Sequence, residues 1–318
     1  MVTVNLERMH EPQVIIGLIK DNLEKTMNPL AIPNEEANYW WKSVSVPSTG
    51  EYMLYTGMLY QLVPYIEYMT MQLEKMETSG MRRFMKMAKK IPKRLLKSLY
   101  GKPASKEMRD RFNNIVASIA KLLSKAGVNY YYKPDIDYYT GILLYDLGDE
   151  EGFQEYARRL AKILRENGVE KIITIDPHTT YAFEKLYPEY ADFEVEVKTY
   201  IEALLESNAE LKCRFSEKVT IHDPCLYGRH LRVSGKSREL LSKAMASVIE
   251  VTNNLELTRC CGGPLESLYP SYAKEIARRR VEELKKTGAS KIVAMCPICL
   301  ANLARGGAEP IDLAELLE

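Results

Sequence analysis

Short apolar runs alternate with helically spaced apolar positions in the last third of the chain. The run KVTIHDP (218–224) ends in Asp-Pro, which predicts a buried strand leading into a turn. Residues 271–288 predict a helix that stops at Gly288. Residues 290–299 predict a strand and a turn, with Pro297 opening the next helix. Residues 246–257 predict a further helix or strand. These elements together indicate an α/β sheet.

An internal repeat extends this pattern to the first half. A shift of 120 residues aligns YARRLAKILRENGVEKIITIDPHTT (156–180) with IARRRVEELKKTGASKIVAMCPICL (276–300). The matches are Ala157, Arg158, Arg159, Gly168, Lys171, Ile172 and Pro177 with Ala277, Arg278, Arg279, Gly288, Lys291, Ile292 and Pro297. The repeat predicts two α/β lobes. We expect a helical segment at 1–47, a first lobe at 48–205 and a second lobe at 206–318.

Cysteines are concentrated in the second lobe. Five of the six are Cys225, Cys260, Cys261, Cys296 and Cys299. The gap from Cys225 to Cys260 and the gap from Cys261 to Cys296 each hold 34 residues. We expect all five at strand-to-helix turns, where ligand sites of α/β sheets usually lie. Cys213 stands apart and is predicted to be a small buried side chain.

Composition and charge limit the partners, the compartment and the cysteine chemistry that we expect. The chain has 318 residues and a net charge of +1, so no overall attraction to nucleic acid is expected. No stretch matches a secretory signal or a run of about 18 apolar residues, which predicts a cytoplasmic protein. In that reducing compartment clustered cysteines bind metal or carry out redox chemistry more often than they form disulfides.

Five thiols exceed the need of the simplest metal sites. Four cysteines suffice for a cubane iron–sulfur cluster, so a fifth indicates a cluster of different shape or an iron with an extra ligand. Such an iron could accept a substrate sulfur, and a disulfide bound there could take electrons and break. Zinc in a four-cysteine site with one spare thiol is the alternative.

Three phrases of the second lobe resemble a known family. HDPCLYGRH, RCCGGP and MCPICLANL are similar to the cysteine-rich CCG domain, which occurs twice in the B-type and D-type components of heterodisulfide reductase and in the iron–sulfur subunits of anaerobic glycerol-3-phosphate, lactate and glycolate dehydrogenases. The resemblance runs from about Gly50 to the C-terminus. Residues 12–41 are similar to the linker that follows a ferredoxin domain in longer relatives.

The resemblance implies a fold, a cofactor and partners. It implies two Rossmann-like lobes and a [4Fe–4S] cluster, noncubane in some relatives, held by the five cysteines. The expected function is a heterodisulfide-reductase-like redox subunit that receives electrons from a ferredoxin-type or flavin-containing subunit. The alternatives are a non-catalytic electron relay or anchor of a quinone-linked dehydrogenase, and a zinc-stabilised scaffold.

Other residues near the motif are candidates for supporting roles. His222 could donate a hydrogen bond to a cluster sulfur or cap a turn. Arg229 could supply charge near the cluster or lie on the surface. The amide of Gly262 could donate to sulfide.

The first lobe has no cysteine at the corresponding positions. Met58, Tyr139, Thr140, Asp176 and Thr179 stand there instead. Met58, Tyr138 and Tyr139 are bulky enough to fill the space of a lost cluster. The other interpretation is a substrate pocket walled by Tyr139 and His178 that faces the surviving cluster across the lobe interface.

A basic segment interrupts the first lobe. Residues 81–102 carry nine lysines and arginines and no acid, interleaved with apolar residues, within a helical insertion at about 75–112. This pattern is typical of an element that lies on an anionic membrane or docks on an acidic partner protein. A solvated basic helix is the alternative.

Overall fold

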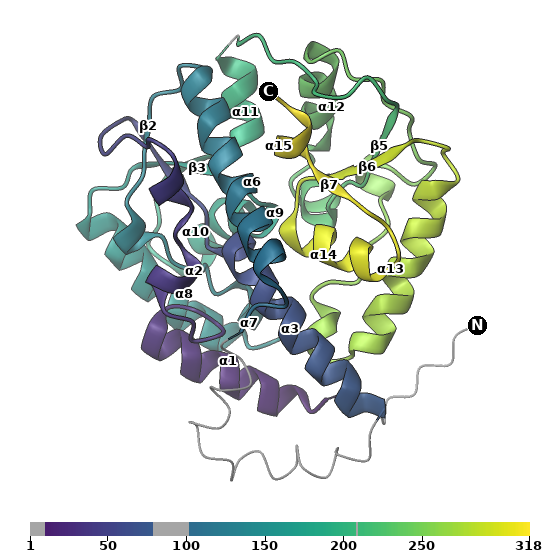
Figure 1. Ribbon diagram of the computed structural model, residues 1–318. Helices are drawn as coiled ribbons and strands as arrows, with labels where there is room; N and C mark the ends of the chain where they lie inside the picture. Colours follow the sequence, from purple (N-terminus) through teal and green to yellow (C-terminus); the bar gives the residue numbers. More distant parts are fainter. Residues whose placement is uncertain (1–9, 79–101, 208) are drawn as a thin grey trace.

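Two parallel β-sheets form the framework of the protein (Figure 1). A computed structural model describes residues 10–78, 102–207 and 209–318. The first sheet has the order β2-β1-β3-β4, and the second has the order β5-β6-β7. All strand pairs within them are parallel. The strands are β1 (Tyr52–Tyr55), β2 (Tyr130–Tyr131), β3 (Lys171–Thr174), β4 (Glu196–Thr199), β5 (Val219–Ile221), β6 (Lys291–Ala294) and β7 (Ile311–Asp312). The predicted α/β class is confirmed.

Helices connect the strands and pack on the sheets. Those around the first sheet are α1 (Pro12–Thr26), α2 (Asn34–Ala37), α3 (Leu59–Thr78), α6 (Lys106–Lys125), α7 (Ile142–Asp146), α8 (Glu150–Glu166), α9 (Pro177–Tyr181), α10 (Tyr187–Tyr190) and α11 (Tyr200–Glu206). Those around the second are α12 (Ser234–Lys243), α13 (Pro270–Lys285), α14 (Pro297–Arg305) and α15 (Leu313–Leu316). Among the described residues, none of the helices is both long enough and apolar enough to span a bilayer.

The elements expected from the second-lobe pattern are present, with one exception. Strand β5, helix α13, strand β6 and helix α14 lie where the sequence predicts them. Residues 246–257 form neither an α-helix nor a ladder strand, which corrects that prediction. They contain one isolated bridge, from Val248 to Val219, and a 3-10 helix at Leu255–Leu257. The Leu255 amide donates to Asp223 Oδ2 at 2.7 Å, so a side chain replaces the sheet as its partner.

Helix α3 joins the two halves. It packs on α6 of the first half and on α13 and α14 of the second, and Figure 1 shows it running between them. At its start, Tyr60 Oη donates to the buried Asp312 Oδ2 at 2.7 Å. Arg111 of α6 donates to both carboxylate oxygens of Glu315 in α15 at 2.8 Å. One continuous apolar core therefore spans both sheets.

The N-terminal segment packs against the first half as an integral layer. Leu23 of α1 is only 1% exposed, and Tyr156 Oη of α8 donates to the carbonyl of Met27 at 3.3 Å. Residues 10–47 contain a 3-10 helix at Trp40–Ser43 in addition to α1 and α2. Apart from Lys102, the predicted basic segment 81–102 lies outside the described residues.

Candidate metal centre and adjoining pocket

The five clustered cysteines reach one place from three chain segments. Cys225 follows β5 and precedes a π-helical turn at Leu226–His230. Cys296 is the N-cap of α14, and Cys299 lies in the first turn of that helix. Cys260 and Cys261 lie in a loop that follows no strand, so the expectation of strand-to-helix turns is wrong for this pair. All five are free thiols, and Cys261, Cys296 and Cys299 are buried.

The sulfur atoms form a continuous chain of contacts. Sγ of Cys261, Sγ of Cys299 and a ring nitrogen of His222 all lie within 4.8 Å of one another. Cys260 is close enough to Cys225 and Cys261 for these thiols to shift one another's pKa. Cys299 in turn perturbs the pKa of both Cys261 and Cys296. The structure therefore brings all five thiols together and leaves Cys213 apart. Cys213 is half-buried and not fully buried as predicted, and its backbone forms an isolated antiparallel β-bridge with Leu317.

The local electrostatics favour thiolates at two of these positions. The hydrogen bond between Cys225 and Cys260 lowers the pKa of Cys260 and raises that of Cys225. Burial opposes ionisation of Cys296, but hydrogen bonds with Cys299 and His178 lower its pKa to about 5. Because thiolates are the metal-binding form of cysteine, the cluster is prepared for a cation.

Two glycines allow the Cys260–Cys261 loop its close approach. Gly262 has a φ of +102°, and its amide donates to Cys260 Sγ at 3.3 Å. A Cβ on Gly262 would lie 2.6 Å from the carbonyl oxygen of Ala273. A Cβ on Gly263 would lie 2.4 Å from Ile298 Cγ2. A side chain at either position would push the loop away from α13 or α14.

His222 faces the thiols as a neutral ring. Arg280 Nε donates to His222 Nδ1 at 3.1 Å. Burial and the charge of Arg280 lower the pKa of His222 to about 3. Since Nδ1 accepts a hydrogen bond and the ring is neutral, the proton is on Nε2. Nε2 is buried without a partner in the described part of the chain, and it is the nitrogen left to face the sulfurs.

The tautomer decides between two roles for His222. A nitrogen that carries its proton can donate to sulfur but cannot ligate a metal. The geometry therefore favours an all-sulfur donor set with His222 as a hydrogen-bond donor. Sequence reasoning missed Arg280, which is 1% exposed. The sequence does contain an indication of its role, because Arg280 lies on the same face of α13 as Ala273, Ala277 and Leu284.

Arg229 contacts the loop that leads to the cysteine pair. Its side chain is exposed, and its guanidinium donates to the carbonyl of Thr258. Thr258 precedes the cysteine pair and its hydroxyl donates to the carbonyl of Asp223 at 2.8 Å. Asn302 of α14, which the sequence did not single out, donates from Nδ2 to Cys261 Sγ at 3.9 Å.

The first-half positions that correspond to the five cysteines carry buried side chains. Met58, Tyr139, Thr140, Asp176 and Thr179 are each at most 4% exposed. Asp176 holds the N-cap position of α9 as Cys296 holds that of α14. Only Asp176 caps with its side chain, which accepts from the amides of His178 and Thr179 at 2.9 and 3.0 Å. The Thr140 carbonyl accepts from Tyr187 Oη at 2.9 Å. These contacts agree with the predicted packing of large side chains there.

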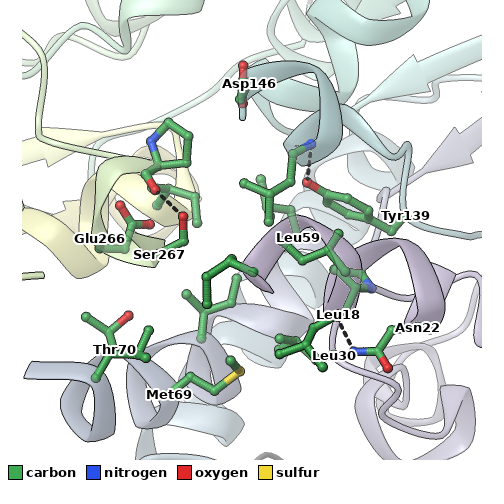
Figure 2. A pocket seen from close by; sticks show the side chains of 18 of the residues that line it. Leu18, Asn22, Leu30, Leu59, Met69, Thr70, Tyr139, Asp146, Glu266 and Ser267 are labelled. Carbon is green, nitrogen blue, oxygen red and sulfur yellow. Dashed lines mark hydrogen bonds between the residues drawn. The ribbon is translucent and has the colours of Figure 1, made fainter. Parts of the chain in front are cut away.

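A pocket adjoins the thiol cluster on the side of the first half (Figure 2). Aliphatic side chains of α1 and α3 form much of its wall, and both Tyr139 and His178 line it. Figure 2 shows Glu266 and Ser267 on one side, Tyr139 on the other, and Leu59 between them. Asp146, Glu266 and α1 were not expected at this site from the sequence.

His178 connects the pocket with the cysteines. Its Nδ1 lies 4.0 Å from Asp146 Oδ2. Burial opposes its charge, but hydrogen bonding with Cys296 and the carboxylate of Asp146 raise its pKa to about 9. Ile298, between Cys296 and Cys299, and Pro264, after the glycine pair, also line the pocket. A ligand in the pocket would therefore touch two of the cysteine-bearing segments.

Comparison with known families identifies the cysteine-bearing half. Residues 219–304 match the model of CCG, the cysteine-rich domain. This stretch contains all five clustered thiols and is a cysteine-rich domain of that type.

The curated relatives are redox proteins. The chain is 35% identical over 205 residues to the probable iron-sulfur-binding oxidoreductase FadF of Bacillus subtilis, covering 62% of this chain and 29% of that protein. It is 30% identical over 229 residues to the EtfAB:quinone oxidoreductase of Syntrophomonas wolfei, covering 65% and 32%. It is 28% identical over 199 residues to the D-type component of the dihydromethanophenazine:CoB–CoM heterodisulfide reductase of Methanosarcina mazei, covering 59% and 49%. The matches thus span less than a third of the first two relatives and about half of the third.

Proposed function

We propose that this chain is an iron–sulfur redox subunit that holds one [4Fe–4S]-type cluster on Cys225, Cys260, Cys261, Cys296 and Cys299. The observation that carries the proposal is the convergence of five free thiols from three segments on one largely buried site. The relatives named as iron–sulfur and oxidoreductase proteins support it. The preferred activity is heterodisulfide-reductase-like, with disulfide reduction, thiol oxidation or electron transfer at the cluster.

The donor set fits an iron–sulfur cluster better than zinc. Five sulfurs exceed a tetrahedral zinc site by one, and the tautomer of His222 removes the nitrogen ligand that a mixed site would use. A fifth cysteine is the basis for proposing a noncubane cluster or an iron with an extra ligand. Such a cluster supplies electrons one at a time and an iron that can bind substrate sulfur.

The chain's own groups would tune that cluster. The Gly262 amide and the Nε2–H of His222 can donate to cluster sulfur, which lowers electron density there and raises the reduction potential. Burial of Cys261, Cys296 and Cys299 keeps water from most of the site. Loss of either donor should therefore lower the potential without removing a ligand.

The partners and location are part of the proposal. Electrons would arrive from a ferredoxin-type or flavin-containing subunit of a larger complex. One relative is named EtfAB:quinone oxidoreductase, which is the name of a redox assembly, and this supports the proposal of redox partners. The basic segment 81–102 would hold the chain peripherally on the cytoplasmic face of a membrane or against its partner.

A duplication would account for the architecture, with lobes at 48–205 and 206–318 after the N-terminal segment 1–47. Strands β3 and β6 begin at Lys171 and Lys291, which are 120 residues apart. Helices α9 and α14 begin at Pro177 and Pro297, with the same offset. This common offset supports two lobes of shared origin, of which the first has lost its ligands.

Metal analysis of anaerobically purified protein tests the proposal. We expect about four iron and four sulfide per chain, with negligible zinc. Serine at any of the five clustered positions should reduce the iron content or alter the EPR spectrum. Cys213→Ser is the matched control and should change neither. Stoichiometric zinc with no iron, or iron that survives in all five variants unaltered, would refute the assignment.

A second candidate is an electron relay of a quinone-linked dehydrogenase. The observation that favours it is the aliphatic pocket beside the thiols, which no lysine or arginine lines among the described residues. The two candidates differ in what perturbs the cluster. Adding a disulfide or thiol should change the EPR signal of a disulfide-reducing site and leave that of a relay unchanged.

A further inference from the structure

A buried carboxyl group lines the pocket beside the cysteine loop. Glu266 lies in a 3-10 helix at Leu265–Ser267, which follows the loop of Cys260 and Cys261 along the chain. Its side chain is 4% exposed and belongs to the pocket lining, as Figure 2 shows. Within the described residues, Glu266 Oε2 is buried and has no hydrogen-bond partner. An unpaired buried carboxyl oxygen is unfavourable, and packing alone gives no reason for it.

The Glu266 carboxyl group lies against the backbone that carries the cysteine pair. The Gly263 carbonyl accepts from Cys260 Sγ at 3.7 Å. A Cβ on Gly263 would lie 3.3 Å from Glu266 Oε2 and 2.9 Å from Asn302 Nδ2. The same Nδ2 atom donates to Cys261 Sγ at 3.9 Å. The Glu266 carboxyl and the Asn302 amide therefore lie together beside the two thiols of this loop.

One guanidinium group lies near two buried carboxyl groups. Arg305 Nε of α14 is 3.2 Å from Glu67 Oε1 of α3, and the two side chains are 11% and 7% exposed. Arg305 also donates from Nη2 to Asn302 Oδ1. A single positive charge cannot neutralise two buried carboxylates, so one carboxyl group keeps its proton. Because Glu67 forms the ion pair, Glu266 is the group that keeps it.

The other titratable groups near Glu266 are consistent with this assignment. Those on the surrounding elements and in the pocket lining are Arg305, Glu67, Tyr139, Asp146 and His178. Burial raises the pKa of Glu266 to about 7, although Arg305 and the Asn302 side chain oppose the shift. Between α3 and α13, Lys274 Nζ pairs with Glu74 Oε1 at 2.9 Å. Glu266 can therefore hold a proton in the resting protein and release it near neutral pH.

Reduction of a disulfide requires protons as well as electrons. The S–S bond takes up two electrons, which come from the ferredoxin-type or flavin-containing subunit of the proposed function, and it breaks into two thiolates. Each thiolate leaves as a thiol only after it gains one proton. Pro264, Glu266 and Ile298 line the same pocket, so a sulfur bound near the cysteine loops would meet the Glu266 carboxyl group.

We propose that Glu266 is the general acid of disulfide reduction at this site. Its O–H bond breaks as an S–H bond forms on one product sulfur, and the second sulfur takes its proton from solvent. The guanidinium of Arg305 stabilises the carboxylate that remains, which then regains a proton from water. The role rests on the proposed disulfide-reducing function and adds the proton source that this function needs.

Infrared spectroscopy of the full chain tests whether Glu266 holds the proton. The difference between the wild type and Glu266→Gln should contain one carbonyl band of a neutral carboxyl group that disappears as the pH rises through about 7. In Glu67→Gln this band should remain and titrate at lower pH, because Arg305 is then left to Glu266. Absence of the band, or its loss in Glu67→Gln alone, would overturn the proposal.

Thiol release tests the catalytic role. The full chain is purified anaerobically, reduced with viologen radical and mixed with hydroxyethyl disulfide, and the rate without protein is subtracted. The wild-type rate should fall as the pH rises through about 7, since a general acid must be protonated. Glu266→Gln should be at least about 100-fold slower and independent of pH in this range. Equal rates of the wild type and this variant would overturn the proposal.

Glu67→Gln is the matched control for these rates. Glu67 is buried beside the same Arg305 but does not line the pocket. Its replacement should leave the maximal rate unchanged and move the midpoint of the pH profile to lower pH. If Glu266→Gln loses iron, this midpoint still tests Glu266, because Glu67→Gln retains the carboxyl group. A midpoint that does not move would overturn the proposal.

The general acid and the proposed function fail in different ways. Iron-loaded wild type that releases no thiol would overturn disulfide reduction, and the role of Glu266 with it, while the iron–sulfur assignment stands. Thiol release that is unchanged in Glu266→Gln would overturn the general acid alone. Iron content is therefore measured on every variant.

Discussion

Arg280 donates from Nε to Nδ1 of His222 at 3.1 Å, and both side chains are buried. The guanidinium is 1% exposed and also donates from Nη1 to Glu283 at 2.7 Å. This pair determines which nitrogen of His222 carries the proton and so which atom is presented to the sulfurs. Arg280 acts on the cluster site through His222 and is a positioning residue.

Replacing Arg280 should change the potential of the cluster. In Arg280→Met the Nδ1 atom loses its donor, and Nε2 is no longer fixed as the protonated nitrogen. Loss of one hydrogen bond of about 1 kcal/mol lowers a one-electron potential by about 40 mV. An EPR-monitored redox titration measures the shift. Arg279→Met, at an exposed neighbour that pairs with Glu275, is the control, and an equal shift in both variants would contradict the role.

Alanine at Gly262 should disrupt the cysteine loop. The positive φ and the 2.6 Å approach to the Ala273 carbonyl leave no room for a Cβ. We expect a loss of about 1–3 kcal/mol in unfolding free energy together with reduced iron content. Gly288→Ala is the matched control, because Gly288 also has a positive φ but nothing within 4 Å of an added Cβ. It should lose stability without losing iron, and iron loss in both would show that strain alone is responsible.

The stability of the contact between the two halves, where Tyr60 donates to Asp312, should depend on pH through the Asp312 carboxyl group. Burial raises the pKa of this carboxyl to about 7, despite hydrogen bonds from Tyr60 and the Ala314 amide and the nearby charge of Arg111. The folded state therefore binds a proton that the unfolded state releases above its ordinary pKa near 3.8. Stability from this group falls as the pH rises from about 4 to 7 and is constant above that range.

The matching measurement compares the wild type with Asp312→Asn by denaturant unfolding across this pH range. The difference in unfolding free energy should move in favour of the variant as the pH rises, by an amount on the order of a few kcal/mol. A difference that is independent of pH between 4 and 7 would show that Asp312 is ionised in the folded protein throughout.

Shortening Leu23 should show that α1 belongs to the folded core. This side chain is 1% exposed, so Leu23→Ala should lower the unfolding free energy by about 2–4 kcal/mol. Val14→Ala, a smaller deletion at a half-buried position of the same helix, should cost less than about 1 kcal/mol. Similar small effects of both variants in thermal or urea unfolding would indicate that α1 is a loosely attached linker.

The local pattern of the sequence determined the elements around the cysteines. Apolar periodicity and Gly288 placed α13, and Pro297 placed the start of α14, because helix formation and capping depend on neighbouring residues. The same approach failed for residues 246–257, where the Leu255 amide pairs with the side chain of Asp223. That partner lies 32 residues away, and local propensity carries no information about it.

By itself, the sequence determined the α/β class, the 120-residue offset of β3 and β6, and the five thiols as one chemical set, since spacing and residue type are written along the chain. Only the tertiary structure decided the tautomer of His222 and the pocket between α1, α3 and the cysteine loops. Both arise from contacts between segments remote in sequence, such as Arg280 with His222. Those contacts exist only after the chain has folded around a shared core.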